Sequence, residues 1–333
     1  MLRVHFSDAD LGRTQVAAAP DPLWEIATSL HRFQVRDGRW AYAQWHRSVR
    51  AHLGEKGLER AFRTVLLPLF PRAAYFPDFL TPVQAGQGLD AGLDAILATP
   101  PRRILEEVAI LDRVVGAPSW APRLAETQTR LELVRVLRAY HEVAIAPYSE
   151  HIQAHIDAER SARCRGLLDG GVEGMLAGLS STMRWQRPVL HVEYPPEDRD
   201  LWLGGRGIKL VPSYFSWRAP TSLADPGLPP VLCYPVLREP PAPPPDTEGP
   251  AAAPLTALLG RARAAALCAV AAGATTGEIA RAAGVSASSA SRHATALRDA
   301  GLITSSRHAA TVLHTLTPVG ASVLRAGTRT AEA

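Results

Sequence analysis

Cysteine, lysine and long apolar runs are scarce in this sequence of 333 residues. The three cysteines, Cys164, Cys233 and Cys268, lie far apart, so they match neither a disulfide framework nor a metal-site spacing. Because no apolar run approaches the roughly 18 residues of a membrane span, no transmembrane helix is expected. The first residues, Met1 to Phe6, lack the apolar segment of a signal peptide. Together these absences predict a cytoplasmic protein.

Aromatic residues are absent from the last part of the chain, since every Trp, Tyr and Phe lies before residue 235. The core of the first part is therefore expected to contain aromatic rings, and that of the last part Ala, Leu and Val. A proline-rich stretch, 238–253, separates the two and has the composition of a semi-rigid, extended linker. The sequence thus predicts two domains, 1–237 and 254–333.

Positive charge is carried almost entirely by arginine, because Lys56 and Lys209 are the only lysines. Residues 254–333 hold eight arginines and three acids, a net charge of +5, whereas the rest of the chain holds 28 basic and 29 acidic residues, a net charge of −1. A GC-rich gene would explain the preference for arginine but not this segregation. The positive excess therefore predicts that the C-terminal domain binds DNA.

Residues 275–301 have the pattern of two short helices joined by a tight turn. Thr275 and Glu278 have the spacing of a capping box. Gly284 stands where the first helix must end, and Ser286 is a favourable N-cap for the second. One face of the second helix, 286–300, is apolar and carries Ala290, Ala294 and Leu297. Its other face carries short polar side chains and one arginine, namely Ser288, Ser289, Ser291, Arg292 and Thr295.

Short polar side chains let a helix enter the major groove, where an arginine reaches a guanine edge or a phosphate. After Gly301 the pattern becomes alternating, and a β-hairpin is expected over 302–306 and 311–316, with Arg307 and His308 near its tip. A helix-turn-helix followed by such a hairpin is a winged helix, whose second helix reads DNA. A plain helical hairpin with an alanine-rich core is the alternative, although chance rarely places caps, glycine and hairpin in this order.

Residues 254–320 resemble the winged-helix domain of ArsR-type transcriptional regulators. The matching residues are Glu278-Ile279-Ala280, Gly284-Val285-Ser286, Ser291-Arg292-His293 and Leu297-Arg298-Asp299-Ala300-Gly301-Leu302. The resemblance covers about a fifth of the chain and implies a DNA-binding regulator, usually dimeric. The sequence departs from the family at Ala290 and Ala294, which replace larger aliphatic residues, and it lacks the metal-binding cysteine pair of many members. The rest of the chain loosely resembles the front domain, of unknown function, of a group of such regulators, and this supplies no site residues.

Periodicity in residues 1–237 predicts a mainly helical domain. Helices are expected at 22–34, 40–49, 58–67, 89–98, 101–115, 122–146, 148–169 and 172–179. A strand is expected at 2–6, and short β-type runs at 189–194, 208–211, 214–217 and 231–234 predict a small antiparallel sheet within 185–237. The expected fold class is therefore mainly α (α+β), with a winged helix at its C-terminal end.

Three groups in the first domain have two interpretations each. His151 and His155 have the spacing of metal ligands on a helix, but no third ligand is evident, and a solvated helix face with ion pairs is the alternative. Gly204 to Gly207 form either an anion nest or a hairpin turn. The aromatic set Trp185, Trp202, Tyr214, Phe215 and Trp217 lines a ligand pocket or packs a core. We therefore expect no metal site and no catalytic residue.

The predicted function is sequence-specific transcriptional regulation by a homodimer that binds double-stranded DNA and needs no cofactor. The predicted DNA-binding residues are Thr276, Ser286, Ser288, Ser289, Ser291, Arg292, His293, Thr295, Arg307 and His308. Arg261 or Arg263 is expected to contact the DNA backbone. The first domain would bind an unknown small-molecule effector, a partner or nothing. The alternative is an enzyme or a protein-interaction module in 1–237 with an appended DNA-binding domain.

Overall fold

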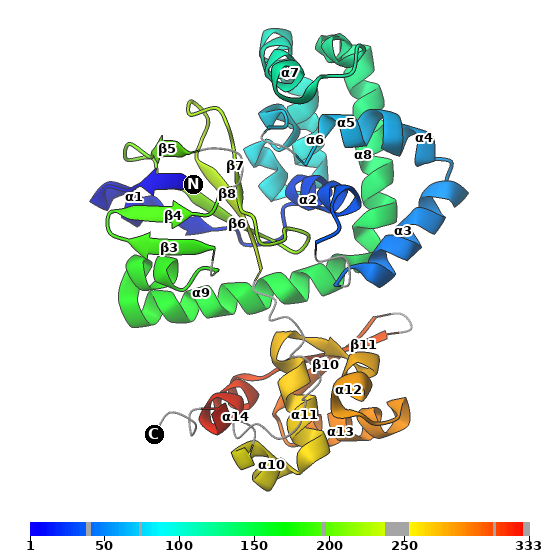
Figure 1. Ribbon diagram of the computed structural model, residues 1–333, viewed down its shortest axis with the longest axis vertical. Coiled ribbons are helices and arrows are strands. Elements are labelled where there is room, and N and C mark those ends of the chain that lie inside the picture. Colours follow the sequence, from blue (N-terminus) through cyan, green and yellow to red (C-terminus); the bar gives the residue numbers. More distant parts are fainter. Residues whose placement is uncertain are drawn as a thin grey trace. The chain divides into compact units, whose positions relative to one another are not determined.

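The computed structural model describes residues 1–37, 41–72, 75–180, 182–194, 198–236, 253–308 and 311–328. The chain forms two compact units, Met1–Val236 and Leu237–Ala333. The predicted linker at 238–253 lies almost entirely outside the described residues. Helices and small mixed sheets give the α+β fold expected from the sequence (Figure 1).

Helices make up most of the first unit. Their bounds are α1 Asp8–Arg13, α2 Pro22–Gln34, α3 Ala43–Glu55, α4 Glu59–Ala61, α5 Leu67–Leu69, α6 Leu89–Ala98, α7 Pro101–Val115, α8 Thr127–Ala144 and α9 Ser149–Ala177. The helices predicted at 22–34, 89–98 and 101–115 are confirmed with these bounds. The long α9 combines two predicted helices, and the break between them lies at Gly170 and Gly171, whose backbone angles are not helical.

The described strands of the first unit form two four-stranded sheets. Their bounds are β1 Leu2–His5, β2 Gln15–Val16, β3 Met183–Gln186, β4 Val189–Val192, β5 Arg199–Trp202, β6 Lys209–Ser213, β7 Thr221–Ser222 and β8 Val231–Pro235. The strand orders are β3-β4-β1-β5 and β2-β6-β8-β7. The prediction of one antiparallel sheet within 185–237 is wrong, because each sheet takes in an N-terminal strand. The strand β1 runs parallel to β5, and β6 runs parallel to β2 and β8.

The predicted strand at 214–217 is also wrong, because this segment is a loop directly after β6. The buried Glu25 of α2 holds the loop in place. Its carboxylate accepts hydrogen bonds from the backbone N–H groups of Tyr214 at 2.7 Å and Phe215 at 3.1 Å. A side chain thus satisfies the amides that a neighbouring strand would otherwise pair.

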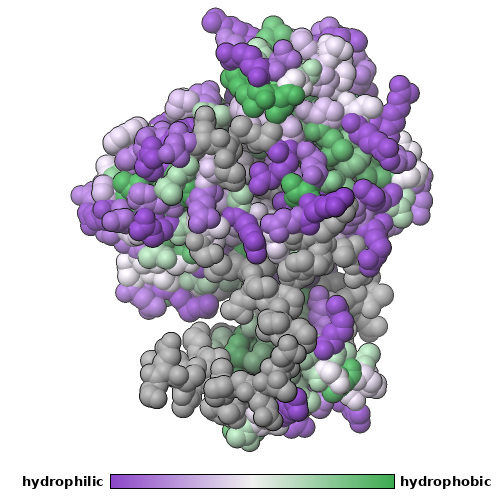
Figure 2. All heavy atoms as spheres, viewed as in Figure 1, coloured by the Kyte–Doolittle hydropathy of each residue, from purple (hydrophilic) through white to green (hydrophobic). Residues whose placement is uncertain are grey.

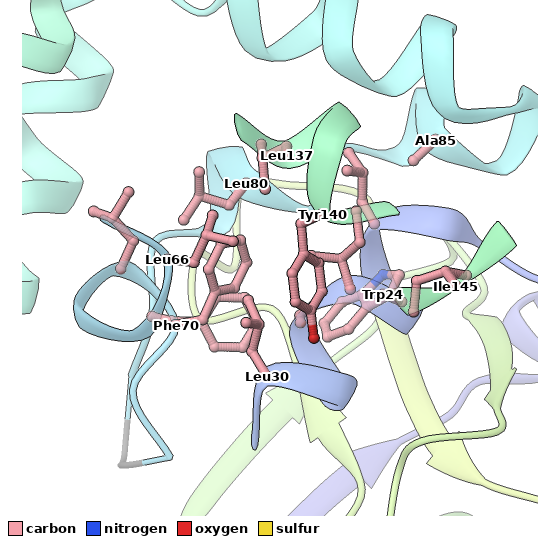
Figure 3. Close-up of a cluster of buried hydrophobic side chains, with 14 of the residues drawn as sticks. Trp24, Leu30, Leu66, Phe70, Leu80, Ala85, Leu137, Tyr140 and Ile145 are labelled. Carbon is pink, nitrogen blue, oxygen red and sulfur yellow. The ribbon is translucent and has the colours of Figure 1, made fainter. Parts of the chain in front are cut away.

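The main core of the first unit lies between α2, α8 and the segment around α5. Trp24 and Leu30 from α2, Phe70 after α5, and Leu137 and Tyr140 from α8 lie within one cluster of buried side chains (Figure 3). Each such side chain contributes about 1.5–3 kcal/mol by leaving water. The hydroxyl of the buried Tyr140 shares a hydrogen bond of 3.0 Å with the Ser29 hydroxyl, so its polar end is also satisfied.

A second core cluster joins the two sheets to the end of α9, which runs along β3 and β6 (Figure 1). It contains Leu2 and Val4 of β1, Leu190 of β4, Leu210 of β6 and Leu176 of α9. On the face of the first unit visible in Figure 2, hydrophilic side chains predominate and apolar ones form small patches. Within the described ranges, no helix is both long enough and apolar enough to cross a bilayer.

The second unit contains short helices and one small sheet. The bounds are α10 Ala253–Leu259, α11 Arg261–Ala269, β9 Ala274–Thr275, α12 Thr276–Ala283, α13 Ala287–Asp299, β10 Ile303–His308, β11 Thr311–Leu316 and α14 Pro318–Thr328. The strands β10 and β11 form the predicted antiparallel hairpin, and β9 pairs with β11. Aliphatic side chains such as Leu267, Ile279, Leu297 and Ile303 form a core that joins α11, α12 and α13 to this sheet.

Candidate nucleic-acid interface

The turn between α12 and α13 is held by caps at both helix ends. The predicted capping box is confirmed, because the Glu278 carboxylate accepts from the Thr275 N–H at 2.8 Å and the Thr275 hydroxyl accepts from the Glu278 N–H. Gly284 ends α12 in the left-handed conformation, with φ 64°, which glycine adopts without steric cost. Ser286 caps α13 by accepting from the Ser289 N–H at 3.3 Å. These caps fix the direction in which α13 leaves the turn.

One face of α13 is buried against the rest of the second unit. Ala290, Ala294 and Leu297 are each at most 1% exposed, as the apolar pattern predicts. The helix ends at a second glycine, Gly301, with φ 70°. The Leu302 N–H then donates back to the Leu297 carbonyl at 2.9 Å, which closes the end of the helix and starts the hairpin.

The opposite face of α13 presents hydroxyl groups and one guanidinium group. Ser288, Ser291, Arg292 and Thr295 are exposed, and Ser289 and His293 are half-buried. Arg292 donates from Nη2 to the Ser289 hydroxyl at 3.1 Å, which orients the guanidinium along the helix surface. No acid occurs in α13 before Asp299, and this carboxylate pairs with Arg298 at 3.0 Å. The exposed face therefore offers donors and positive charge to acceptor groups.

Thr276, another predicted contact, lies half-buried at the start of α12 with its hydroxyl 3.0 Å from Nε2 of His314. The other ring nitrogen of His314, Nδ1, lies 2.8 Å from the Ser305 hydroxyl. Burial lowers the pKa of His314, and the positive charge of Arg298 acts in the same direction. A neutral imidazole thus joins α12 to the hairpin. The sequence did not single out His314, because one histidine within a β-type run carries no signal of its own.

The tip of the hairpin is only partly described. The backbone of β10 extends to His308, but the side chains of Arg307 and His308, both predicted contacts, lie outside the described part of the structure. Arg261 and Arg263, expected on the DNA backbone, are exposed on α11. The structure therefore brings the predicted α13 residues onto one face and does not test the predicted role of the hairpin tip.

The two histidines with metal-ligand spacing pack against a tyrosine. His151 Nε2 lies 3.0 Å from the Tyr214 hydroxyl, and His155 Nδ1 lies 2.9 Å from the carbonyl oxygen of His151. Both rings stand edge-on to the Tyr214 ring at centroid distances of 5.1 Å. Among the residues that the structure describes, no group of three or more possible metal ligands occurs. Both histidines are half-buried, and the ion pairs expected on this helix face remain a prediction.

The glycine-rich loop Gly204–Gly207 connects β5 of one sheet to β6 of the other, so the predicted hairpin turn is wrong. Asp10 accepts a hydrogen bond from the Gly207 N–H at 2.9 Å. Burial alone would raise the pKa of Asp10, but hydrogen bonds from Ser7 and Gly207 lower it. A Cβ on Gly207 would lie 2.5 Å from the Arg13 carbonyl oxygen, so only glycine fits there. The negative charge that this loop contacts is therefore the Asp10 carboxylate of the protein itself.

The five candidate aromatic residues lie in three separate places. Trp202 is 67% exposed and stacks on His5 with a centroid distance of 3.8 Å. Trp185 packs edge-on against Phe6 at 5.2 Å. The other three, Tyr214, Phe215 and Trp217, surround the Tyr42 ring at centroid distances of 5.9 Å or less. Neither a single pocket nor a single core therefore explains the set.

Comparisons of the chain with protein-family models, with curated proteins and with solved structures found no match. The assignment of a function therefore depends on the residues and contacts described above. Among them, the face of α13 opposite its buried side carries exposed hydroxyl groups and positive charge on a helix that is fixed by its caps and its packing.

Proposed function

We propose that this protein is a sequence-specific DNA-binding transcriptional regulator of the cytoplasm and that its second unit is a winged helix-turn-helix domain. The helix α13 enters the major groove, and the hairpin β10–β11 lies on the flanking backbone or in the minor groove. The observation that carries the proposal is the two-faced character of α13. Ala290 and Ala294 are buried and pack the helix against the rest of the domain. On the opposite face, Ser288, Ser291, Arg292 and Thr295 remain exposed.

The order of the elements supports this proposal. Helix α11, strand β9, helices α12 and α13, and the hairpin β10–β11 follow one another as in a winged helix, and the three strands form one sheet. In helix-turn-helix proteins the N-terminal residues of the second helix contact base edges. In α13 this region carries Ser288, Ser291 and Arg292. Its helix dipole and its capped N-terminus add a favourable field for DNA phosphates.

The distribution of charge supports the same proposal. Exposed arginines lie on the two helices that contact α13, namely Arg261 and Arg263 on α11 and Arg281 on α12. Contacts of such residues with phosphates provide affinity without sequence selection. In this proposal Arg292 discriminates bases, because a guanidinium forms two parallel hydrogen bonds with a guanine edge.

A homodimer is part of the proposal. One winged domain covers a small area of DNA, and two-fold pairing doubles the number of contacts. The large apolar side chains of Leu258 on α10 and Val319 on α14 are 71% and 59% exposed, which suits a surface that a second copy covers. The first unit would regulate DNA binding if an effector bound more tightly to one of two conformations, DNA-binding and non-binding, than to the other.

The variant Arg292→Ala tests the proposed role of α13. It should weaken binding to a selected DNA site by roughly 1–3 kcal/mol and relax the preference at one base pair. The site is first selected from random duplexes with the wild-type protein. Fluorescence anisotropy with the selected site and with each single-base change then gives both quantities.

Arg60→Ala is the matched control, because Arg60 is exposed on α4 of the first unit and its loss changes the net charge equally. The control should bind as the wild type does. If Arg292→Ala also binds all duplexes as the wild type does, Arg292 makes no base contact. If the wild-type protein selects no sequence from the random pool, the proposed function is wrong.

A further inference from the structure

His314 is a buried polar residue where the hairpin of the second unit meets α12. It lies on β11, the central strand of the three-stranded sheet, and is 5% exposed. The registers place it opposite Ser305 of β10 and Ala274 of β9. Because β9 leads directly into α12, this strand position lies next to the start of that helix, which contacts β11 (Figure 1).

Both ring nitrogens of His314 lie within hydrogen-bond distance of a hydroxyl group. Nε2 lies 3.0 Å from the hydroxyl oxygen of Thr276 at the start of α12, and Nδ1 lies 2.8 Å from that of Ser305 on β10. A hydroxyl group both donates and accepts, so either tautomer of the neutral ring forms one hydrogen bond of each kind. These contacts form a bridge of three residues, Thr276, His314 and Ser305, which we call the His314 bridge.

The His314 bridge lies between the packed end of the hairpin and its tip. At the packed end, Ile303 of β10 is paired with Leu316 of β11, and both belong to the core of the second unit. Toward the tip, Arg307 follows Ser305 by two residues on β10. Apolar packing therefore fixes the end of the hairpin that joins the domain, and the bridge fixes the pair of residues nearer to the tip.

The bridge also gives the Thr276 hydroxyl a partner within the protein. Thr276 is half-buried and belongs to α12, the helix that the turn at Gly284 connects to α13. The hydroxyl therefore links the pair of helices to the hairpin. In a winged helix, the second helix and the hairpin contact one duplex together, which requires that the two be held in a fixed relative position.

We infer that His314 is a positioning residue for DNA binding: through Thr276 and Ser305 it holds the hairpin where it reaches the DNA that flanks the site read by α13. This inference rests on the proposed function. It makes Thr276 a support of the hairpin instead of the direct DNA contact that the sequence predicted. His314 thus contributes to the affinity for flanking DNA and not to the base preference of α13.

His314→Leu tests the inference, because leucine fills a similar volume and removes both hydrogen bonds. Fluorescence anisotropy with the full chain compares the selected site in two duplexes, one with long flanks and one trimmed by about half a helical turn on each side. Trimming should weaken binding by the wild type about threefold to tenfold, since the hairpin loses its phosphate contacts. His314→Leu should bind the long duplex as weakly as the trimmed one, and the trimmed one as the wild type does.

Thr276→Val removes the other end of the bridge at nearly constant size. It should reproduce His314→Leu, and the double variant should bind no more weakly than either single variant, because both changes break one network. Thr315→Val is the matched control. The hydroxyl groups of Thr304 and Thr315 lie 2.8 Å apart in the neighbouring pair of the same hairpin, and their hydrogen bond does not reach α12. The control should bind both duplexes as the wild type does.

Hydrogen exchange of the free protein tests the bridge without DNA. Peptides from 303–308 and 311–316 should exchange at least about fivefold faster in His314→Leu than in the wild type, because the hairpin opens more often. Peptides from 287–299, which contain α13, should exchange as in the wild type. This pattern separates a local effect on the hairpin from unfolding of the whole unit.

The inference is overturned if trimming weakens His314→Leu as much as it weakens the wild type, or if the hairpin exchanges equally fast in both. Weaker binding of Thr276→Val to the trimmed duplex also overturns it, because a direct contact of Thr276 with DNA gives that result. A wild-type protein that selects no sequence overturns the proposed function and the DNA-binding role of His314 with it. The exchange measurement then still decides whether the bridge holds the hairpin.

Discussion

At the scale of single residues, buried carboxylates organise the loops of the first unit. Asp78 accepts from the backbone N–H groups of Ala224 at 3.0 Å and Asp225 at 2.8 Å, and Glu107 accepts from that of Phe79 at 2.8 Å. Burial raises the pKa of both carboxyl groups, and these hydrogen bonds oppose the rise. Together with Glu25, they hold segments that no regular backbone ladder supports. We expect their loss to disorder loops rather than to abolish a reaction.

Asp21 caps α2 in the same way and gives the clearest dependence on pH. It is 3% exposed, and burial raises its pKa from 3.8 to about 6, against hydrogen bonds from Trp24 and Leu23 and the charge of Lys209. Because the folded pKa exceeds the unfolded one, its contribution to stability is complete below about pH 4 and is lost as the pH rises through about 6. Asn caps a helix equally well and does not ionise.

The variant Asp21→Asn should therefore gain stability relative to the wild type between pH 4 and pH 7, by on the order of 3 kcal/mol at most. Urea unfolding followed by tryptophan fluorescence measures this, because every tryptophan lies in the first unit. Asp94→Asn, at an exposed position of α6, is the control and should show no such change. A constant difference between Asp21→Asn and the wild type at both pH values contradicts the prediction.

At the scale of elements, the second unit depends on how α14 joins the end of α13. The Thr317 hydroxyl donates to the Gly301 carbonyl at 2.6 Å and accepts from the Gly320 N–H at 3.0 Å. A Cβ on Gly320 would lie 1.9 Å from the Leu302 carbonyl oxygen. That oxygen belongs to the backbone between α13 and β10, so it has little freedom to move. The helix α14 therefore requires glycine at this position in order to pack.

Gly320→Ala should destabilise the second unit by about 1–3 kcal/mol, the usual cost of overpacking, or by more. Gly277→Ala is the matched control, because the nearest atom to its added Cβ is the Thr275 hydroxyl at 4.0 Å. That substitution should leave α12 equally stable or stabilise it by up to about 1 kcal/mol. Hydrogen exchange of peptides from 276–300 reports on this unit, which has no aromatic residue for fluorescence. Equal protection in both variants would show that α14 does not pack tightly.

At the scale of the whole molecule, positive charge is distributed unequally along the chain. The C-terminal part, 254–333, carries a net charge of +5, and the remainder carries −1. If the proposed DNA binding through the second unit holds, it should weaken steeply with salt, by a slope of about −0.9 in log K against log salt for each phosphate contact. The first unit, which is near neutral, should not contribute to this slope.

Arg281→Ala tests this electrostatic contribution. Arg281 is exposed on α12, and in the described part of the chain its guanidinium donates only to the Gly277 carbonyl, at 3.4 Å. The variant should reduce the salt slope by about 1 and weaken binding equally for selected and random duplexes. Anisotropy titrations at several salt concentrations measure both. An effect confined to the selected site would instead assign Arg281 to base recognition.

Much of the second unit was predictable from short stretches of sequence. The capping box at Thr275 and Glu278, the turn at Gly284, the cap at Ser286 and the hairpin after Gly301 all occur as expected. Each depends on hydrogen bonds between residues a few positions apart, so a local pattern is sufficient to predict it. The same holds for α2, α6 and α7, whose apolar periodicity shows their buried faces.

Remote contacts were not predictable in this way. The strand β1 pairs with β4 and β5, which begin at Val189 and Arg199, and no pattern within Leu2 to His5 indicates these partners. In the sequence, Glu25 is an ordinary acidic residue near the start of a helix. In the folded chain, its carboxylate accepts a hydrogen bond from the loop at Tyr214. His31 of α2, Arg72 after α5 and Ser216 after β6 line one small surface hollow, although they are far apart in the sequence. Local backbone preferences set which helices and turns form, whereas burial and hydrogen bonding across the folded chain select which of them lie together.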